Sequence, residues 1–220
     1  MHFFIQKFIL CALLSFVPPA YSKTHKTSDY LVASSQKEYD DLLANKAVAL
    51  CRRVRKKKIK MATHNAHRLL RVERQIGIPD LMYGMTLAAA CLESAFNERA
   101  EGDHKFSKKR KPLAIGILQL WSWVKQYKVN RMNLESSSMF WLNHIVRQRQ
   151  KTKRKCRPRS ALRSWRQAWV TAVRFPKKGG RCREKPRHWR LFLKLQKFKK
   201  KVILKYSPNI RSSDGNQKTN

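Results

Sequence analysis

Acidic residues are scarce in this chain of 220 residues. Asp and Glu number 13 against 50 Lys and Arg, which gives a formal net charge of +37. The imbalance is strongest between Ser136 and Ser213, where 25 Lys and Arg meet a single acid, Glu184. The composition therefore indicates a polyanionic partner of some kind. Hydrophobic residues still make up 42% of the chain, which excludes disorder throughout and allows one domain with a real core.

Long apolar runs are missing as well. The run Phe8 to Val17 is too short to span a bilayer, which needs about 20 residues, and no later stretch is long enough. The run follows Lys7, and Ala20-Tyr21-Ser22 supplies small residues at a cleavage site, so residues 1–22 are expected to be a signal peptide. A buried helix is the alternative. We expect export to the periplasm or secretion, where wall polymers and anionic lipid headgroups are closer partners than nucleic acid.

Metal-ligand spacing is absent from the seven histidines. His64 and His67 lie three residues apart, but the charged residues nearest to them, Lys60, Arg68 and Arg71, are all basic. We expect no metal site and no cofactor.

Four cysteines remain after removal of a signal peptide that contains Cys11. An even number in an exported chain indicates two disulfides, and four cysteines allow three pairings. We favour Cys51 with Cys91 and Cys156 with Cys182, because each pair then lies within one half of the chain. Reduced, buried cysteines are the alternative.

Strand-like alternation and internal repeats are also lacking, so the expected class is all-α. Apolar residues recur at helical spacing in most of the chain. The expected helices span 36–60, 64–76, 79–96, 115–128, 134–154, 159–175 and 186–204. We expect a polar lead and basic helix over 23–60, a catalytic domain over 61–204 and a flexible polar tail over 205–220.

Glu93 stands out because it lies at the end of the most apolar expected helix, after Ala89-Ala90-Cys91-Leu92. Partial desolvation there raises the pKa of a carboxyl group and keeps it protonated nearer neutral pH. Cleavage of a glycosidic bond needs such a group to protonate the leaving oxygen. The alternative is a glutamate on the solvent-facing side of the helix.

Two short motifs, one that begins with Glu93 and one that follows it after a loop, resemble motifs of a known family. Glu93-Ser94-Ala95-Phe96, followed by Gly116-Ile117-Leu118-Gln119, resembles the Glu-Ser-x-Phe and Gly-Leu-Met-Gln motifs of the lytic transglycosylases. The resemblance covers about residues 79–175, under half of the chain. Gly102-Asp103-His104, taken with the stretch from Gly116 to Trp121, is also similar to a less studied exported branch of that superfamily.

The resemblance implies a lysozyme-like helical fold with a glycan-binding cleft. It also implies cleavage of the β-1,4 bond between N-acetylmuramic acid and N-acetylglucosamine in peptidoglycan. Glu93 would be the single acid and base, giving a 1,6-anhydro product without water. Ser94 would support Glu93, Gly116 would let the backbone approach the sugar, and Gln119 would contact its polar groups.

The third family motif, Ala-Tyr-Asn, is replaced here by Ala168-Trp169-Val170. In the family the tyrosine touches the catalytic glutamate, so Trp169 is a substrate-binding candidate, with a place in the core as the alternative. Trp121, together with Trp123 and Tyr127, follows Gln119 closely and could stack on sugar faces.

Two other functions stay open. A lysozyme-type hydrolase of the inverting kind needs a second carboxylate some 6.5–9.5 Å from the first, for which Asp103 is the best candidate, ahead of Glu98 and Glu101. A catalytically weak binder of anionic wall polymers would use the basic C-terminal half alone. We expect a monomer that acts on peptidoglycan strands and docks on anionic wall or membrane surfaces. A secreted nucleic-acid-binding protein is not favoured, because it would need base-stacking aromatics on its basic face, whereas the aromatics here mostly follow helical core spacing.

Overall fold

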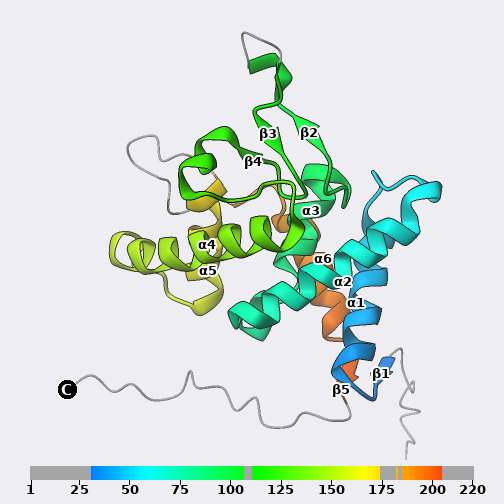
Figure 1. Ribbon diagram of the computed structural model, residues 1–220. Coiled ribbons are helices and arrows are strands. Elements are labelled where there is room, and N and C mark those ends of the chain that lie inside the picture. Colours follow the sequence, from blue (N-terminus) through cyan, green and yellow to red (C-terminus); the bar gives the residue numbers. More distant parts are fainter. Residues whose placement is uncertain (1–30, 107–110, 174–181, 183–184, 205–220) are drawn as a thin grey trace, which may run out of the picture.

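Helix α3 (Met85–Ser94) lies at the centre of the structure (Figure 1). The computed structural model describes residues 31–106, 111–173, 182 and 185–204. Eight of the ten residues of α3 are buried, and only Leu92 and Glu93 are partly exposed. Small side chains at Ala88, Ala89 and Ala90 allow neighbouring elements to approach closely, so α3 is the element around which the fold is built.

The helices around α3 form a mostly helical molecule, as the sequence predicts. Figure 1 shows α1 and α2 on one side of α3 and α4 and α5 on the other, and α6 also contacts α3. Their bounds are α1 Gln36–Leu50, α2 Ile59–Ile76, α4 Leu134–Cys156, α5 Ala161–Val173 and α6 Trp189–Lys199. Short 3-10 helices span Lys56–Lys58, Asp80–Met82, His104–Phe106 and Ser122–Tyr127.

Two small sheets correct the expectation of a chain without strands. β2 (Glu101–Gly102), β3 (Ala114–Ile115) and β4 (Leu120–Trp121) form an antiparallel sheet above α3 (Figure 1). β1 (Leu31–Ala33) pairs in parallel with β5 (Val202–Leu204). Each strand has only two or three residues, too few for an alternating pattern to be visible in the sequence. The helix expected over 115–128 is therefore wrong in its first half, where the chain forms β3, a turn and β4.

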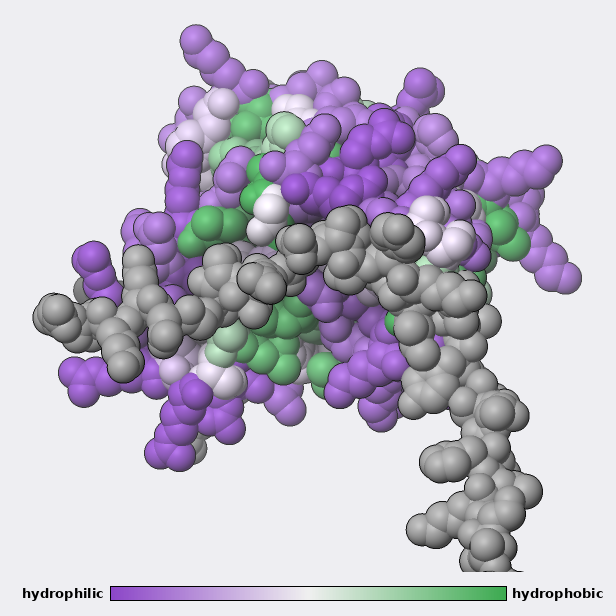
Figure 2. Space-filling model, turned by 90° about the horizontal axis from the view of Figure 1, so that it is seen from below, coloured by the Kyte–Doolittle hydropathy of each residue, from purple (hydrophilic) through white to green (hydrophobic). Residues whose placement is uncertain are grey.

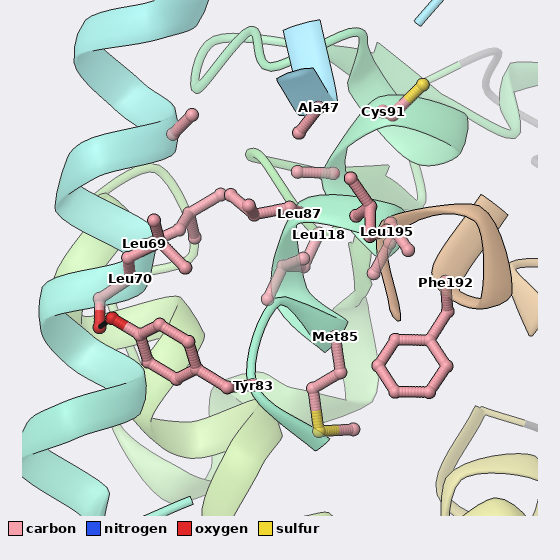
Figure 3. Packing of buried hydrophobic residues seen from close by; sticks show 14 of the residues in the cluster. Ala47, Leu69, Leu70, Tyr83, Met85, Leu87, Cys91, Leu118, Phe192 and Leu195 are labelled. Atoms are coloured by element: carbon pink, nitrogen blue, oxygen red, sulfur yellow. Dashed lines mark hydrogen bonds between the residues drawn. The ribbon is translucent and has the colours of Figure 1, made fainter. Parts of the chain in front are cut away.

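The core is continuous from α1 to α6. Figure 3 shows Leu69 and Leu70 of α2 facing Leu87 of α3, with Phe192 and Leu195 of α6 on the other side. The buried cluster also includes Tyr39, Leu43 and Ala47 of α1. The boundary expected at residue 60 therefore does not separate two cores, because α1 packs into the same core as the other helices.

Glycines mark two helix boundaries, of which the first agrees with the expectation and the second does not. Gly77 ends α2 in a left-handed conformation, with φ of 71°, as the sequence predicts. Gly84, with φ of 92°, breaks the helix expected over 79–96, so α3 begins only at Met85. The last expected helix ends at Lys199, because the chain then joins β1 as strand β5.

Two disulfides confirm the favoured pairing of the cysteines. Cys51 at the end of α1 is bonded to Cys91 of α3, and Cys156 at the end of α4 is bonded to Cys182. Disulfides persist in oxidising compartments, which is consistent with export. Within the described ranges, no helix is both long and apolar enough to cross a membrane. The expected signal peptide and the expected tail lie outside the described residues.

Candidate active site

Glu93 lies one residue before the C-terminal end of α3, and its side chain is 13% exposed. The helix ends because Ala95 and Phe96 both adopt left-handed backbone conformations, with φ of 53° and 62°. Such conformations are unfavourable for residues other than glycine and persist only where the surroundings enforce them. Here the amide of buried Asn65 donates to the Phe96 carbonyl at 2.9 Å.

Further contacts hold this end of α3 from the side of α1. The disulfide from Cys51 reaches Cys91, two residues before Glu93. Arg53, in the loop after α1, donates to the Leu92 carbonyl. The backbone that carries Glu93 is therefore held on both sides, as a preorganised site requires.

Two residues next to α6 contact the Glu93 carboxylate, although they lie 94 and 95 positions further along the chain. Nε2 of His188 is 2.6 Å from Oε1. Nε of Arg187 donates to Oε1 at 3.1 Å, and the Arg187 Nη2 atom contacts Oε2. The Arg187 side chain is 65% exposed and that of His188 only 1%, so a buried imidazole and an exposed guanidinium meet on one carboxylate.

These partners reverse the expected direction of the Glu93 pKa. Burial raises it, but the hydrogen bonds from His188 and Arg187 and the electrostatic interactions of both residues with the carboxylate outweigh burial and hold the pKa of Glu93 below its usual value. The expectation of a protonated carboxyl near neutral pH is therefore wrong for this arrangement of side chains. Here Glu93 is a carboxylate.

The second motif forms the turn between β3 and β4 and is bonded to the loop that follows α3. The backbone N–H of Gln119 donates to the Gly116 carbonyl at 3.1 Å and closes the turn. Ala100, seven residues after Glu93, accepts from the Gly116 N–H at 2.9 Å and from the Gln119 amide at 3.0 Å. The structure thus ties the second motif to the loop that follows the first motif.

The roles expected of Gly116 and Gln119 need correction. Gly116 has φ of 84°, and a Cβ atom there would overlap with the Arg131 carbonyl oxygen. The glycine is therefore needed for packing within the protein rather than for approach of a sugar. The Gln119 side-chain nitrogen donates to the carbonyls of Ala100 and Gly116, so both of its N–H groups support the turn in this structure.

Trp169 is also placed differently from the substrate-binding assignment. Its side chain is fully buried, which excludes stacking on a sugar and agrees with the alternative of a core residue. Its ring lies parallel to that of His188, with centroids 5.7 Å apart and an interplanar angle of 6°. The third motif therefore reaches Glu93 only through His188.

The remaining candidates lie on α3, on β4 and in the loops next to β2. Ser94 is buried and its hydroxyl donates to the Ala90 carbonyl, so it stabilises the helix end. Trp121 in β4 is 39% exposed. Asp103 follows β2 with φ of 58° and is partly buried, and none of the hydrogen bonds that Glu93 makes to described residues involves it. Glu98 is engaged by Arg68 at 2.9 Å.

Sequence reasoning missed Arg187 and His188. They stand in Pro186-Arg187-His188-Trp189 at the start of α6, where no local pattern distinguishes them from the other basic residues of the region. Among the described residues, no group of three or more His, Cys, Asp or Glu is arranged to hold a metal ion. Comparison of the chain with protein families, with curated proteins and with solved structures gave no match.

Proposed function

We propose that this protein is an exported lytic transglycosylase that cleaves peptidoglycan strands at the bond between N-acetylmuramic acid and N-acetylglucosamine. One observation carries the proposal. A largely buried carboxylate, Glu93, stands at the strained end of the central helix, and the turn of the second motif is hydrogen-bonded to Ala100 in the loop that follows this helix. Strained backbone clusters at functional sites, and two other candidate residues, Asp103 and Gln119, have positive φ as well. The lysozyme-like fold and the glycan cleft belong to the same proposal, which the mostly helical structure supports.

The chemistry requires that Glu93 become protonated, and the exposed Arg187 side chain offers a route. A neutral sugar that enters between the two side chains would displace Arg187 towards solvent. Burial and the negative end of the α3 dipole would then both favour the protonated form of Glu93. Glu93 gives its proton to the glycosidic oxygen as the bond from C1 breaks. It then takes the proton of the C6 hydroxyl, whose oxygen bonds to C1.

The test is a zymogram with peptidoglycan in the gel, in which Glu93→Gln is compared with wild type. Glutamine keeps the shape of the side chain but removes the titratable proton. We expect a folded variant without lytic activity, a loss of at least about a hundredfold, because general acid–base catalysis contributes about 10²–10⁴-fold. Activity within a few-fold of wild type would exclude Glu93 as the catalytic group.

Product masses distinguish transfer from hydrolysis. Transfer to the C6 hydroxyl gives anhydro-muropeptides, which are lighter by one water molecule than hydrolysed ones. If only reducing ends form, the enzyme is a muramidase, and Asp103→Asn should then abolish cleavage.

A second candidate is a protein that binds anionic wall polymers without cutting them. The ion pair between Glu93 and Arg187 favours it, because a carboxylate held in its charged form is a poor proton donor. Sacculi that bind the protein but release no fragments would establish this alternative.

A further inference from the structure

We propose that His188 is the positioning residue of the Glu93 carboxylate: its neutral imidazole donates one hydrogen bond that orients the group for reaction. The part of this inference that concerns catalysis rests on the proposed function of Glu93. The contact itself does not. Nε2 of His188 lies 2.6 Å from Oε1 of Glu93, a short distance that is typical of a bond to an ionised acceptor.

The protonation state of His188 follows from its other nitrogen. Nδ1 is buried and has no hydrogen-bond partner among the described residues. A proton on Nδ1 would leave an unpaired N–H group in the interior, and an imidazolium would add an unsolvated charge to it. The arrangement with the lowest cost carries one proton on Nε2, directed at Glu93 at 2.6 Å, and leaves the longer contact of 3.4 Å from Arg187 Nε without a hydrogen bond.

The imidazole is also held in place from behind. Trp169 lies parallel to it, and Trp169 makes edge contacts with Trp141 and Phe192 at centroid distances of 5.8 and 5.7 Å. A ring that is 1% exposed and packed in this way keeps its orientation when Arg187 moves. His188 is thus the fixed donor and Arg187 the displaceable one.

His188 and Arg187 contact the two carboxylate oxygens of Glu93 differently. Oε1 accepts from both His188 and Arg187, whereas Oε2 contacts Arg187 alone. When Arg187 leaves, Oε2 is the freed oxygen and is the one expected to carry the transferred proton. A further charged group on this part of α3 is Arg53, which donates to the Leu92 carbonyl.

The experiment follows the protonation of Glu93 by carboxyl ¹³C NMR in the protein purified after export. The Glu93 signal is identified by its absence in Glu93→Gln. His188→Phe keeps the stack on Trp169 but removes the donor, and we expect it to raise the pKa of Glu93 by about one pH unit. His188→Gln restores an N–H donor and should bring the pKa back towards the wild-type value. His64→Phe, an exposed histidine on α2, is the matched control and should change nothing.

Cleavage assays then test the positioning role. We expect His188→Phe to lower kcat about tenfold with little change in KM, and to shift the acid limb of the pH profile together with the pKa of Glu93. His188→Gln should recover part of kcat. A folded His188→Phe protein in which the pKa of Glu93 is unchanged would overturn the inference.

A second measurement needs no variant. Imidazole ¹⁵N shifts of the wild-type protein should show neutral His188 with its proton on Nε2 wherever Glu93 is ionised. A proton on Nδ1 alone, or an imidazolium, would contradict the proposal. If the wild type cleaves no glycan while both NMR results are as expected, the proposed function fails and the contact between His188 and Glu93 stands.

Discussion

Glu73 and Glu93 are two carboxyl groups at opposite ends of α3. Their hydrogen-bond partners differ, and their pKa values shift in opposite directions. Glu73 lies on α2 and accepts from the Gly84 N–H at 2.5 Å and from the Thr86 N–H and hydroxyl at 2.6 Å each, at the start of α3. These donors are neutral, so burial dominates and raises the pKa of Glu73 to about 7. Glu93 at the other end has a guanidinium partner, and its pKa falls.

The raised pKa of Glu73 predicts a dependence of stability on pH. The folded state binds the proton more tightly than the unfolded chain, so the stabilisation is complete below pH 4.5 and is lost as the pH rises towards 7. The total change is about 3 kcal/mol, since one pH unit corresponds to about 1.4 kcal/mol. Free energies of unfolding measured by denaturant at several pH values between 4.5 and 8 should decline accordingly.

Glu73→Gln should remove this part of the slope, because glutamine is neutral at every pH. The exposed Glu101 provides the control, and Glu101→Gln should keep the wild-type slope. An unaltered slope in Glu73→Gln would mean that Glu73 does not titrate in this range.

At the scale of elements, α3 is held by covalent bonds and caps as well as by packing. Cys51–Cys91 joins α1 to α3 across a sequence separation of 40. Cys156–Cys182 joins the end of α4 to Cys182, which precedes α6 in the chain, across a separation of 26. The first lies beside Glu93, and the second precedes Arg187 and His188 in the chain. Both bridges therefore brace parts of the candidate site.

Loss of either disulfide should be clearly measurable. We expect the double variants Cys51→Ala with Cys91→Ala, and Cys156→Ala with Cys182→Ala, each to lose about 2–4 kcal/mol of unfolding free energy. Thermal unfolding of oxidised and reduced wild type provides the comparison. Alkylation of two or more cysteines in the denatured but unreduced protein would show that these bridges do not form after export.

At the scale of the whole molecule, charge is the dominant feature. Hydrophilic residues cover most of the face shown in Figure 2. We expect the basic C-terminal half to dock the protein on anionic wall or membrane surfaces rather than to take part in chemistry. Exposed charges are screened beyond about 8 Å at physiological salt. Binding to intact sacculi should therefore weaken steeply with salt, whereas cleavage of a short soluble glycan should respond much less.

Exposed lysines of α6 allow a direct test of docking. Lys194, Lys197 and Lys200 are exposed, whereas Lys199 is buried against Asp80 at 2.9 Å and must be left unchanged. Each removed lysine should cost about 1 kcal/mol at an anionic surface. The triple change to Gln should therefore weaken sacculus binding at low salt by tenfold or more. Lys57, Lys58 and Lys60→Gln removes equal charge elsewhere, and equal weakening in both variants would refute a specific role of the C-terminal half.

Much of the fold was predictable because it depends on local patterns. Apolar spacing located the main helices, Gly77 marked the end of α2, and the division of the cysteines between the halves of the chain indicated the pairing. The short strands were not predictable, since a strand of two residues such as Ala114–Ile115 depends on its partner across the sheet rather than on its own composition. The helix break at Gly84 was missed because the capping carboxylate belongs to Glu73, on another helix.

The sequence by itself determined the helical class, the central apolar helix and the singular position of Glu93, because these properties depend on residues close together in the chain. Only the tertiary structure decided the chemistry around that carboxylate. His188 and Arg187 reach it across more than 90 positions, Trp169 becomes the support of His188, and the direction of the Glu93 pKa is reversed. The pKa of a buried group is set by whatever the fold places within hydrogen-bond distance, and that placement has no local signature.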